Sequence, residues 1–299
     1  MRFVLLGGSG ILGTGFLDAL ARERRAREVV RLRPDWSHPD LAGRQVRDQV
    51  AAALDHEGPT TVLWAAGVGS VGAGREEMES ERAGLAATCA VLADLPAARR
   101  HRTRLVFASS AGAVHAANDG RPIREDSPTV PLSEYGRAKL AQEQLCRDVG
   151  SSAEVGVLIC RYSNLYGLAS GRLPAKGLIP AAIRAARLRQ PMSIYVSPDT
   201  RRDYVYGPDA AAATLALARD LPAGTTVALV AQGATSTVAE IVHTVGGILG
   251  RRVPATFAVR PETALQPRTL PFAPRHPVPT LVARTPVSVA IHRMAHAPA

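Results

Sequence analysis

The chain has 299 residues, of which 46% are hydrophobic and 4% aromatic, and it carries a formal net charge of +10. This length accommodates one large or two modest domains with a sizeable core. A basic chain is compatible with a nucleic-acid partner, but the arginines are scattered apart from short clusters at 22–27 and 99–104, with no zinc-ligand spacing or aromatic stacking motif. We therefore expect anionic small molecules as ligands, and neither nucleic acid nor a metal ion.

The cysteine pattern and the apolar runs indicate the compartment. Cys89, Cys146 and Cys160 lie far apart and form no Cys-x-x-Cys pair, which is typical of free thiols in a reducing compartment. The apolar run at the N-terminus is too short for a signal peptide, and no stretch approaches the ~18 apolar residues of a membrane span. We expect a cytoplasmic protein with no membrane partner.

The first predicted elements are a buried strand at residues 2–6, a glycine-rich turn and a helix whose apolar spacing begins at residue 11. The start of a helix presents unpaired N–H groups and the positive end of the helix dipole, which favour a phosphate. Glycines in the turn let a pyrophosphate approach and let the helix pack against the strand. The spacing Gly-x-x-Gly-x-x-Gly in this setting predicts a dinucleotide-binding turn. The residues assigned to it are Gly7, Ser9, Gly10, Ile11, Leu12 and Gly13.

The second predicted strand, residues 28–33, bears on the choice of cofactor. Dinucleotide folds use an acidic residue near the end of this strand to bind the adenosine ribose, but the candidates here are Arg31 and Arg33. An arginine attracts the 2′-phosphate of NADP, and the missing carboxylate removes a repulsion. The alternative is that both arginines simply face solvent in an arginine-rich chain. We predict NADP as the cofactor, with NAD as the alternative.

Strands and helices alternate up to about residue 160. We predict a weak strand near Gln45 and Val46, strands at 60–66, 104–108 and 155–160, and helices at 49–57, 76–95 and 133–148. A glycine-rich loop at 67–74 follows the strand at 60–66, on the side where open parallel sheets bind ligands. This alternation predicts an α/β fold, a Rossmann-type doubly wound parallel sheet with helices on both faces.

The alternation breaks down after residue 166. We predict one helix at 178–188, and a helix at 209–220 and a strand at 226–230 that return to the sheet. The tail from Arg251 is rich in proline, and we expect it to cover a site and not to form a core. The predicted division is a NAD(P)-binding domain of residues 1–166 with 205–232, and a smaller substrate-binding region of residues 167–204 with 233–299.

Tyr135 and Lys139 are the second informative pair. Residues four apart share one face of a helix, so the ammonium lies beside the phenol and stabilises the phenolate. A tyrosine placed in this way can exchange a proton during hydride transfer. Tyr-x-x-x-Lys by itself is often just two solvated side chains. Here it follows the strand at 104–108 and Ser109-Ser110 by one loop, in a chain that opens with a dinucleotide turn.

An ordered set of motifs resembles the extended short-chain dehydrogenase/reductases, and most closely their nucleotide-sugar epimerases, dehydratases and 4-ketoreductases. The motifs span about residues 3–215 and are the turn at 7–13, Ala65-Ala66, Ser109-Ser110, the segment 135–139, the segment 161–167, and the segment 201–206 with Asp209. The resemblance implies a homodimer formed by the helices at 76–95 and 133–148.

The resemblance also implies roles for individual residues. Tyr135 would be the acid/base, and Lys139 would support it and bind the nicotinamide ribose. Ala65 and Ala66 would lie beside the cofactor. Asn164 would contact the substrate and Arg202 would hold a nucleotide diphosphate.

Three positions depart from the pattern of this family. Ala111 stands where the family has a serine or threonine that orients the reacting group, so we assign that role to Ser110, with Ser109 in reserve at the substrate site. His115 stands where a tyrosine is common, and we place it in the substrate pocket, with a catalytic base as the alternative. Ala111-Gly112 offers no acidic pair, which argues against a dehydratase.

The favoured function is an NADP-dependent oxidoreductase that reduces the 4-keto group of a nucleotide-activated sugar. The close alternative is a nucleotide-sugar 4-epimerase that uses the same residues. A non-catalytic NADP-binding regulator is less favoured, because Ala111 and His115 alone support it and the intact Tyr135–Lys139 pair opposes it.

Overall fold

The computed structural model describes residues 1–22, 28–67, 75–258 and 267–297, and it confirms the predicted Rossmann-type α/β fold. Six parallel strands form the main sheet in the order β2-β1-β3-β4-β5-β9. Their bounds are β1 (Arg2–Leu6), β2 (Glu28–Leu32), β3 (Thr60–Trp64), β4 (Thr103–Ser110), β5 (Gly156–Tyr162) and β9 (Gly224–Val230). The strand order reverses between β1 and β3, so a ligand crevice is expected at the carboxyl ends of these two strands.

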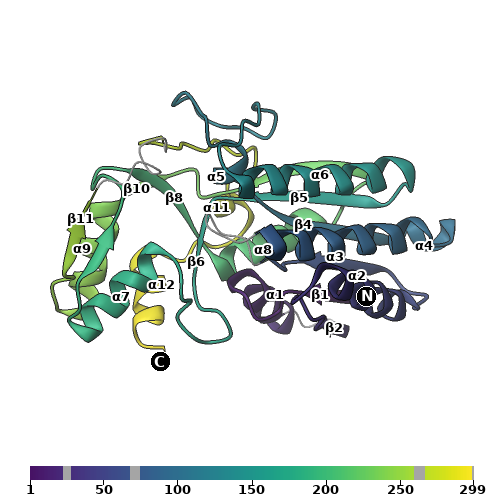
Figure 1. Cartoon of the computed structure of the whole chain (residues 1–299), viewed down its shortest axis with the longest axis horizontal. Coiled ribbons are helices and arrows are strands. Elements are labelled where there is room, and N and C mark those ends of the chain that lie inside the picture. Colours follow the sequence, from purple (N-terminus) through teal and green to yellow (C-terminus); the bar gives the residue numbers. More distant parts are fainter. Residues whose placement is uncertain (23–27, 68–74, 259–266, 298–299) are drawn as a thin grey trace.

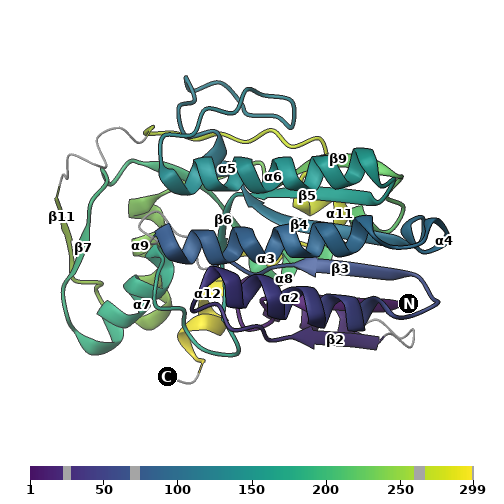
Figure 2. The same ribbon diagram turned by 45° about the vertical axis from the view of Figure 1, so that its right-hand side comes forward.

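Helices cover both faces of this sheet. On one face lie α1 (Ile11–Arg22) and α8 (Gly207–Ala218), and on the other α2 (Pro39–Leu54), α3 (Arg75–Ala93) and α6 (Glu134–Ser152), which run side by side in Figure 2. Alternate side chains of a strand point to opposite faces; in β1, Phe3 and Leu5 pack toward α1 and α8, whereas Val4 and Leu6 pack toward α2 and α3. Burial on both faces explains why the strands are almost continuously apolar.

The second region lies beyond the carboxyl ends of the main sheet, on the left of Figure 1. A three-stranded sheet contains β6 (Asn164–Tyr166), β8 (Arg201–Tyr206) and β10 (Thr235–Thr237), and β7 (Met192–Ile194) pairs with β11 (Ala255–Phe257). The helices α7 (Leu178–Leu188), α9 (Val238–Leu249) and α12 (Val287–Ala295) share a separate core. The short helices are α4 (Ala97–Arg100), α5 (Ala111–Val114) and α11 (Val278–Leu281). Within the described ranges, no helix is both long and apolar enough to cross a membrane.

The predicted strand near Gln45 and Val46 is wrong, because residues 39–54 form the single helix α2. The helix begins where the His38 side chain accepts a hydrogen bond from the Asp40 N–H, and Pro39 lies in the first turn, where its missing N–H costs nothing. The helical spacing of the apolar residues then decides the structure. The residues that it buries are Ala42, Val46, Val50, Ala53 and Leu54.

The prediction that the tail forms no core is also wrong for its last part. Ile291 and Met294 of α12 are fully buried against α7 and α9. Proline breaks the pattern upstream, but Pro286 immediately precedes α12 and does not interrupt it. The nine residues that follow are long enough to bury one apolar face.

The turn between β1 and α1 is packed so closely that glycine is required at two positions. Gly7 has φ +82°, and a Cβ placed on it would lie 2.4 Å from the backbone carbonyl of Ala65. A Cβ on Gly13 would lie 2.1 Å from the carbonyl oxygen of Gly7. A Cβ on Gly10 would meet only that oxygen, at 3.6 Å. Gly7 and Gly13 therefore let the backbone close on itself, and Gly10 leaves space on the ligand side.

Gly13→Ala should lower the free energy of unfolding by about 1–3 kcal/mol, because the added methyl group collides with backbone that cannot move aside. Gly247→Ala is the matched control within α9, where a Cβ meets nothing within 4 Å. That substitution should instead stabilise the protein by about 0.5–1 kcal/mol. Denaturant unfolding monitored by circular dichroism measures both changes. Equal stability of Gly13→Ala and the parent protein would contradict the close packing.

Candidate active site

Two adjoining cavities open at the carboxyl end of the main sheet. The first has a volume of about 270 Å³ and the second of about 440 Å³. Four residues predicted from the sequence line both cavities, although they come from four separate parts of the chain: Ser110, Tyr135, Asn164 and Arg202. The tail contributes Pro267, Leu270 and Phe272 to the first cavity. This part of the tail does cover the site, as the sequence predicted.

Tyr135 lies in the first turn of α6, and two contacts hold that turn in place. The Ser133 hydroxyl caps the helix by accepting a hydrogen bond from the Gly136 N–H at 3.1 Å. A Cβ on Gly136 would lie 2.5 Å from the carbonyl oxygen of Ala113, so only glycine allows α6 to approach α5 this closely. The phenol is thereby held beside Ser110, at the carboxyl end of β4.

Lys139 lies one turn farther along α6 and is buried. Its Nζ donates to Glu81 Oε1 at 2.6 Å and to the carbonyl oxygen of Ala108 at 3.3 Å. The same atom lies 5.2 Å from the centre of the Phe107 ring and 5.9 Å from that of the Tyr135 ring. Burial by itself lowers the pKa of Lys139, but the Glu81 carboxylate outweighs it, so the pKa lies above its ordinary value. The group beside Tyr135 is therefore an ammonium ion.

Glu81, on α3, is a functional candidate that the sequence interpretation missed. It is 2% exposed, and its carboxylate accepts a hydrogen bond from Lys139, 58 residues away in the chain. The neighbouring residues 75–82 are mostly charged, which is typical of a solvated helix face. Helical periodicity could have identified it, because Glu81 lies on the same helix face as the buried Leu85 and Leu92, four and eleven residues later.

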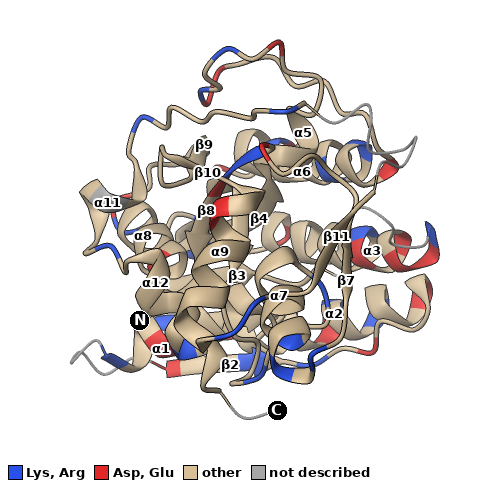
Figure 3. Ribbon diagram, turned by 90° about the vertical axis from the view of Figure 1, so that its left-hand side faces the viewer, with Lys and Arg blue, Asp and Glu red and all other residues tan. Residues whose placement is uncertain are grey.

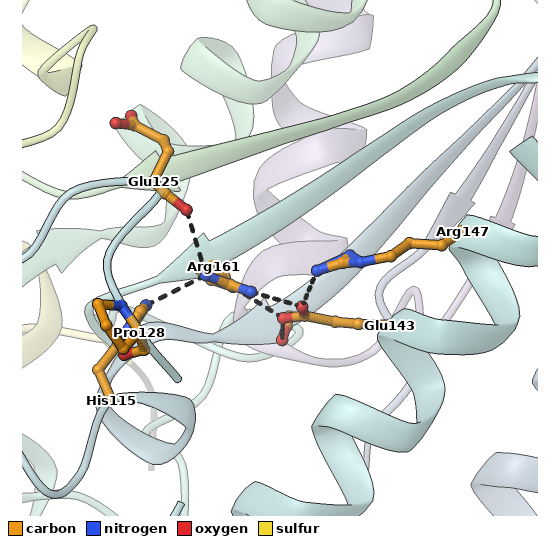
Figure 4. Close-up of polar contacts among 7 residues, drawn as sticks. His115, Glu125, Pro128, Glu143, Arg147 and Arg161 are labelled. Atoms are coloured by element: carbon orange, nitrogen blue, oxygen red, sulfur yellow. Dashed lines mark hydrogen bonds and ion pairs between the residues drawn. The ribbon is translucent and has the colours of Figure 1, made fainter. Parts of the chain in front are cut away.

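Ser109 faces a buried ionic network rather than a substrate. Its hydroxyl donates to Glu143 Oε1 at 2.7 Å. The same carboxylate accepts two bonds from Arg161, at 2.9 and 2.8 Å, and one from Arg147 at 3.0 Å, as Figure 4 shows for the charged groups. Ser109 is committed to this network although it also lines the second cavity. Ser110 is therefore the better placed of the two serines for a substrate.

The structure places His115 outside the two cavities that Tyr135 lines, although the sequence analysis assigned it to the substrate pocket. His115 is 2% exposed, lines neither of the two cavities, and belongs to a third cavity under the loop at 117–130. Its Nδ1 lies 2.9 Å from the carbonyl oxygen of Pro128 and its Nε2 3.2 Å from Arg161 Nη1 (Figure 4). Nδ1 therefore carries the proton and Nε2 accepts. Burial lowers the pKa of His115, which keeps the ring neutral and suited to this role.

Arg202 and Asp203 are neighbours on β8 with opposite environments. Arg202 lines both cavities, and its Nη1 donates to the carbonyl oxygen of Arg201 at 2.8 Å. Asp203 is fully buried and accepts from the Ser163 hydroxyl at 2.6 Å and from three backbone N–H groups of residues 232–234 at 2.8–3.2 Å. Burial raises the pKa of Asp203, and these four hydrogen bonds act against the rise. Asp203 thus anchors the strand that presents Arg202.

The expected cofactor crevice runs between the glycine turn and Lys139. Arg31 Nε lies 3.2 Å from the Cβ position of Gly8, so the guanidinium covers the turn. Arg33 follows β2 directly and is exposed. At the other end, Gly67 faces the ion pair, with its Cβ position 3.7 Å from Glu81 Oε1 and 3.9 Å from Lys139 Nζ. Open space at Gly10 and cations at both ends fit a dinucleotide. The rest of the glycine-rich loop, residues 68–74, lies outside the described residues.

Glu81→Gln should lower the free energy of unfolding by about 3–5 kcal/mol, because it leaves the buried ammonium without an opposite charge. Glu79→Gln is the matched control: Glu79 lies on the same helix, is 44% exposed and pairs with Arg82. Its loss should cost at most about 1 kcal/mol. Thermal and denaturant unfolding measure both. Equal stability of the two variants would show that the buried ion pair adds nothing to the free energy of unfolding beyond what an exposed pair adds.

The sequence model of the NAD dependent epimerase/dehydratase family matches residues 3–229 of this chain. The UDP-glucose 4-epimerase of Azospirillum brasilense is 31% identical over 290 residues, covering 87% of this chain and 80% of that relative.

Two solved structures share the fold over 99% of this chain. MoeE5 in complex with UDP-glucose and NAD has a TM-score of 0.80 at 21% identity, covering 97% of that chain. UDP-glucuronic acid 4-epimerase from Bacillus cereus, in complex with UDP-glucuronic acid and NAD, has a TM-score of 0.80 at 17% identity, covering 98% of that chain. The chain therefore belongs to the NAD dependent epimerase/dehydratase family of enzymes, within the extended short-chain dehydrogenase/reductases that its motifs resemble.

Proposed function

We propose that the protein is a nucleotide-sugar 4-epimerase. The observation that carries the proposal is that Tyr135, with the Lys139 ammonium beside it, lines the same two cavities as Asn164 and Arg202. One cavity system thus holds an acid/base group and a cation suited to a diphosphate. The 4-epimerase activity named for the relative from Azospirillum brasilense supports epimerisation over the net reduction favoured on sequence grounds.

The chain supplies proton transfer and orientation at C4 of the sugar. A dinucleotide held between the glycine turn and Lys139 would supply reversible hydride transfer at C4, and removal and return of the hydride on opposite faces of the ring would invert the configuration. The Tyr135 phenolate accepts the proton of the 4-hydroxyl group in the first half of the reaction and returns it to the carbonyl oxygen of the 4-keto sugar in the second. The Lys139 ammonium stabilises the phenolate. The Ser110 hydroxyl donates to the same sugar oxygen.

The other end of the substrate is held by β8 and β6. The Arg202 guanidinium pairs with the diphosphate, for which its planar set of donors is well matched. Asn164, at the start of β6 and exposed to both cavities, contacts the sugar. Asp203 does not touch the substrate in this scheme. It fixes the strand from which Arg202 projects.

We further propose NADP as the dinucleotide. Arg31 covers Gly8, and Arg33 occupies the end of β2, where an acidic residue would bind the ribose hydroxyls of NAD. The two solved structures named above hold NAD. NAD is therefore the alternative.

A 4-ketoreductase is the second candidate, and the same two arginines favour it, since net reductases commonly draw on NADPH. The two activities separate in one experiment. An epimerase converts UDP-glucose into its 4-epimer without net oxidation of the cofactor, which chromatography of the nucleotide sugars detects. A reductase instead oxidises NADPH when a 4-keto nucleotide sugar is added, which is followed by the loss of NADPH absorbance. The second result without the first would overturn the epimerase proposal.

Tyr135→Phe should lower turnover by about 10²–10⁴-fold, because it removes the group that transfers the proton. Cofactor affinity should stay nearly unchanged, since the ring remains. Tyr195→Phe is the control, as Tyr195 lines neither cavity. Initial rates and fluorescence titration with the dinucleotide measure the two effects. Unaltered turnover in Tyr135→Phe would refute this mechanism.

Arg31→Ala and Arg33→Ala should each weaken NADP binding by about 10–100-fold, the value of a hydrogen bond to a charged group, and change NAD binding little. Arg44→Ala, an exposed arginine of α2, is the control for general charge. Titration of the apoprotein with each dinucleotide gives the ratio of the two dissociation constants. An equal loss for both cofactors would show that the arginines are surface charges only.

A further inference from the structure

The basic residues of this chain are almost all arginines. The sequence contains 34 arginines and 2 lysines, Lys139 and Lys176. In Figure 3 the basic residues are spread over several elements, with acidic residues among them. On a solvated surface either residue type serves, but a compact ammonium with rotatable donors and a planar guanidinium are not interchangeable at a specific contact. A lysine in so arginine-rich a chain therefore differs from nearly all of the other cations in the contacts that it can make.

Lys139 already has such a use, and Lys176 lies close to the same chemistry. Lys176 is in the loop before α7 and lines the cavity of about 440 Å³ together with Tyr135 and Arg202. Lys176 does not line the cavity of about 270 Å³, which Arg202 shares. Both lysines of the chain are therefore near Tyr135 or share its cavity. Lys139 lies beside the Tyr135 ring and Lys176 lines the same cavity, although 37 residues separate the two lysines in the sequence. The two cations of the larger cavity come from different elements: Lys176 from the loop before α7 and Arg202 from β8.

The charged side chains described along this cavity are all positive. Among the described residues that line it are the two cations and no aspartate or glutamate. Three of the tyrosines that line it do not supply a negative charge: burial raises the pKa of Tyr204 to about 12 and raises those of Tyr162 and Tyr166 as well. Two cations in a concave site strengthen the local field and attract anionic ligands.

We propose that Lys176 binds an anionic group of the nucleotide-sugar substrate, at a point separate from the one held by Arg202, and so helps to determine which sugars are accepted. The proposal rests on the function proposed above. The group is a phosphate of the diphosphate or a carboxylate on the sugar, since an ammonium recognises both in the same way. The first source makes Lys176 a general substrate-binding residue. The second makes it selective for acidic sugars.

The test is equilibrium binding of UDP, UDP-glucose and UDP-glucuronic acid to the protein loaded with its dinucleotide, by titration calorimetry. Lys176→Gln should weaken binding by about 10–100-fold. Arg172→Gln is the matched control, because Arg172 is exposed on the same loop and lines neither cavity. The control should bind all three ligands as the parent does.

The pattern of loss identifies the group. Equal weakening of all three ligands assigns Lys176 to the diphosphate, whereas weakening of UDP-glucuronic acid alone assigns it to a sugar carboxylate. Unchanged binding of all three, or a loss confined to the dinucleotide, would overturn the proposal. If the parent protein itself binds none of the UDP ligands, the proposed function fails and this inference fails with it, a result distinct from the failure of Lys176 alone.

Discussion

The ion pair between Glu81 and Lys139 is the contact on which the active site depends. It joins α3 to α6 beneath the carboxyl end of β4, at a place where both charges are almost completely removed from water. An isolated ammonium there would lose its charge. With Glu81 present it remains a cation beside Tyr135. The pair also faces Gly67, so one buried interaction contributes both to the electrostatics of the proposed proton-transfer site and to one wall of the proposed cofactor crevice.

Buried carboxylates also fix neighbouring side chains and loops elsewhere around the site. Glu143 holds Arg161 and Ser109, and Asp203 holds the loop at 232–234 to β8. Each carboxylate meets several donors, which offsets the cost of removing its charge from water. The cavities are thus framed by groups that cannot move without leaving a charge unpaired. Side chains that face the cavities, such as Arg202, are presented from this rigid frame.

Much of the fold was predictable because its signals are local. A buried strand followed by Gly-x-x-Gly-x-x-Gly and an apolar helix specifies the β1–α1 turn within thirteen residues. The helix at 178–188 was predicted with the bounds that the structure has. The failures were also local: residues 45–46 look like a strand until the helical spacing of their neighbours is weighed, and the proline-rich tail hid a short apolar helix at 287–295. Residues 109 and 115 could not be placed, because their partners lie 34 and 46 residues away.

The amino-acid sequence alone was enough to predict the family, the α/β architecture, the glycine turn after β1 and the nearness of Tyr135 and Lys139. These depend on spacing along one strand or helix, which is written in the order of the residues. Three outcomes became visible in the folded chain alone: Glu81 pairs with Lys139, the Ser109 hydroxyl is bound to Glu143 whereas Ser110 lines both cavities, and His115 belongs to an ionic network. Those outcomes depend on which distant charges share a buried space, because a group removed from water takes its properties from whichever partner the fold brings within reach.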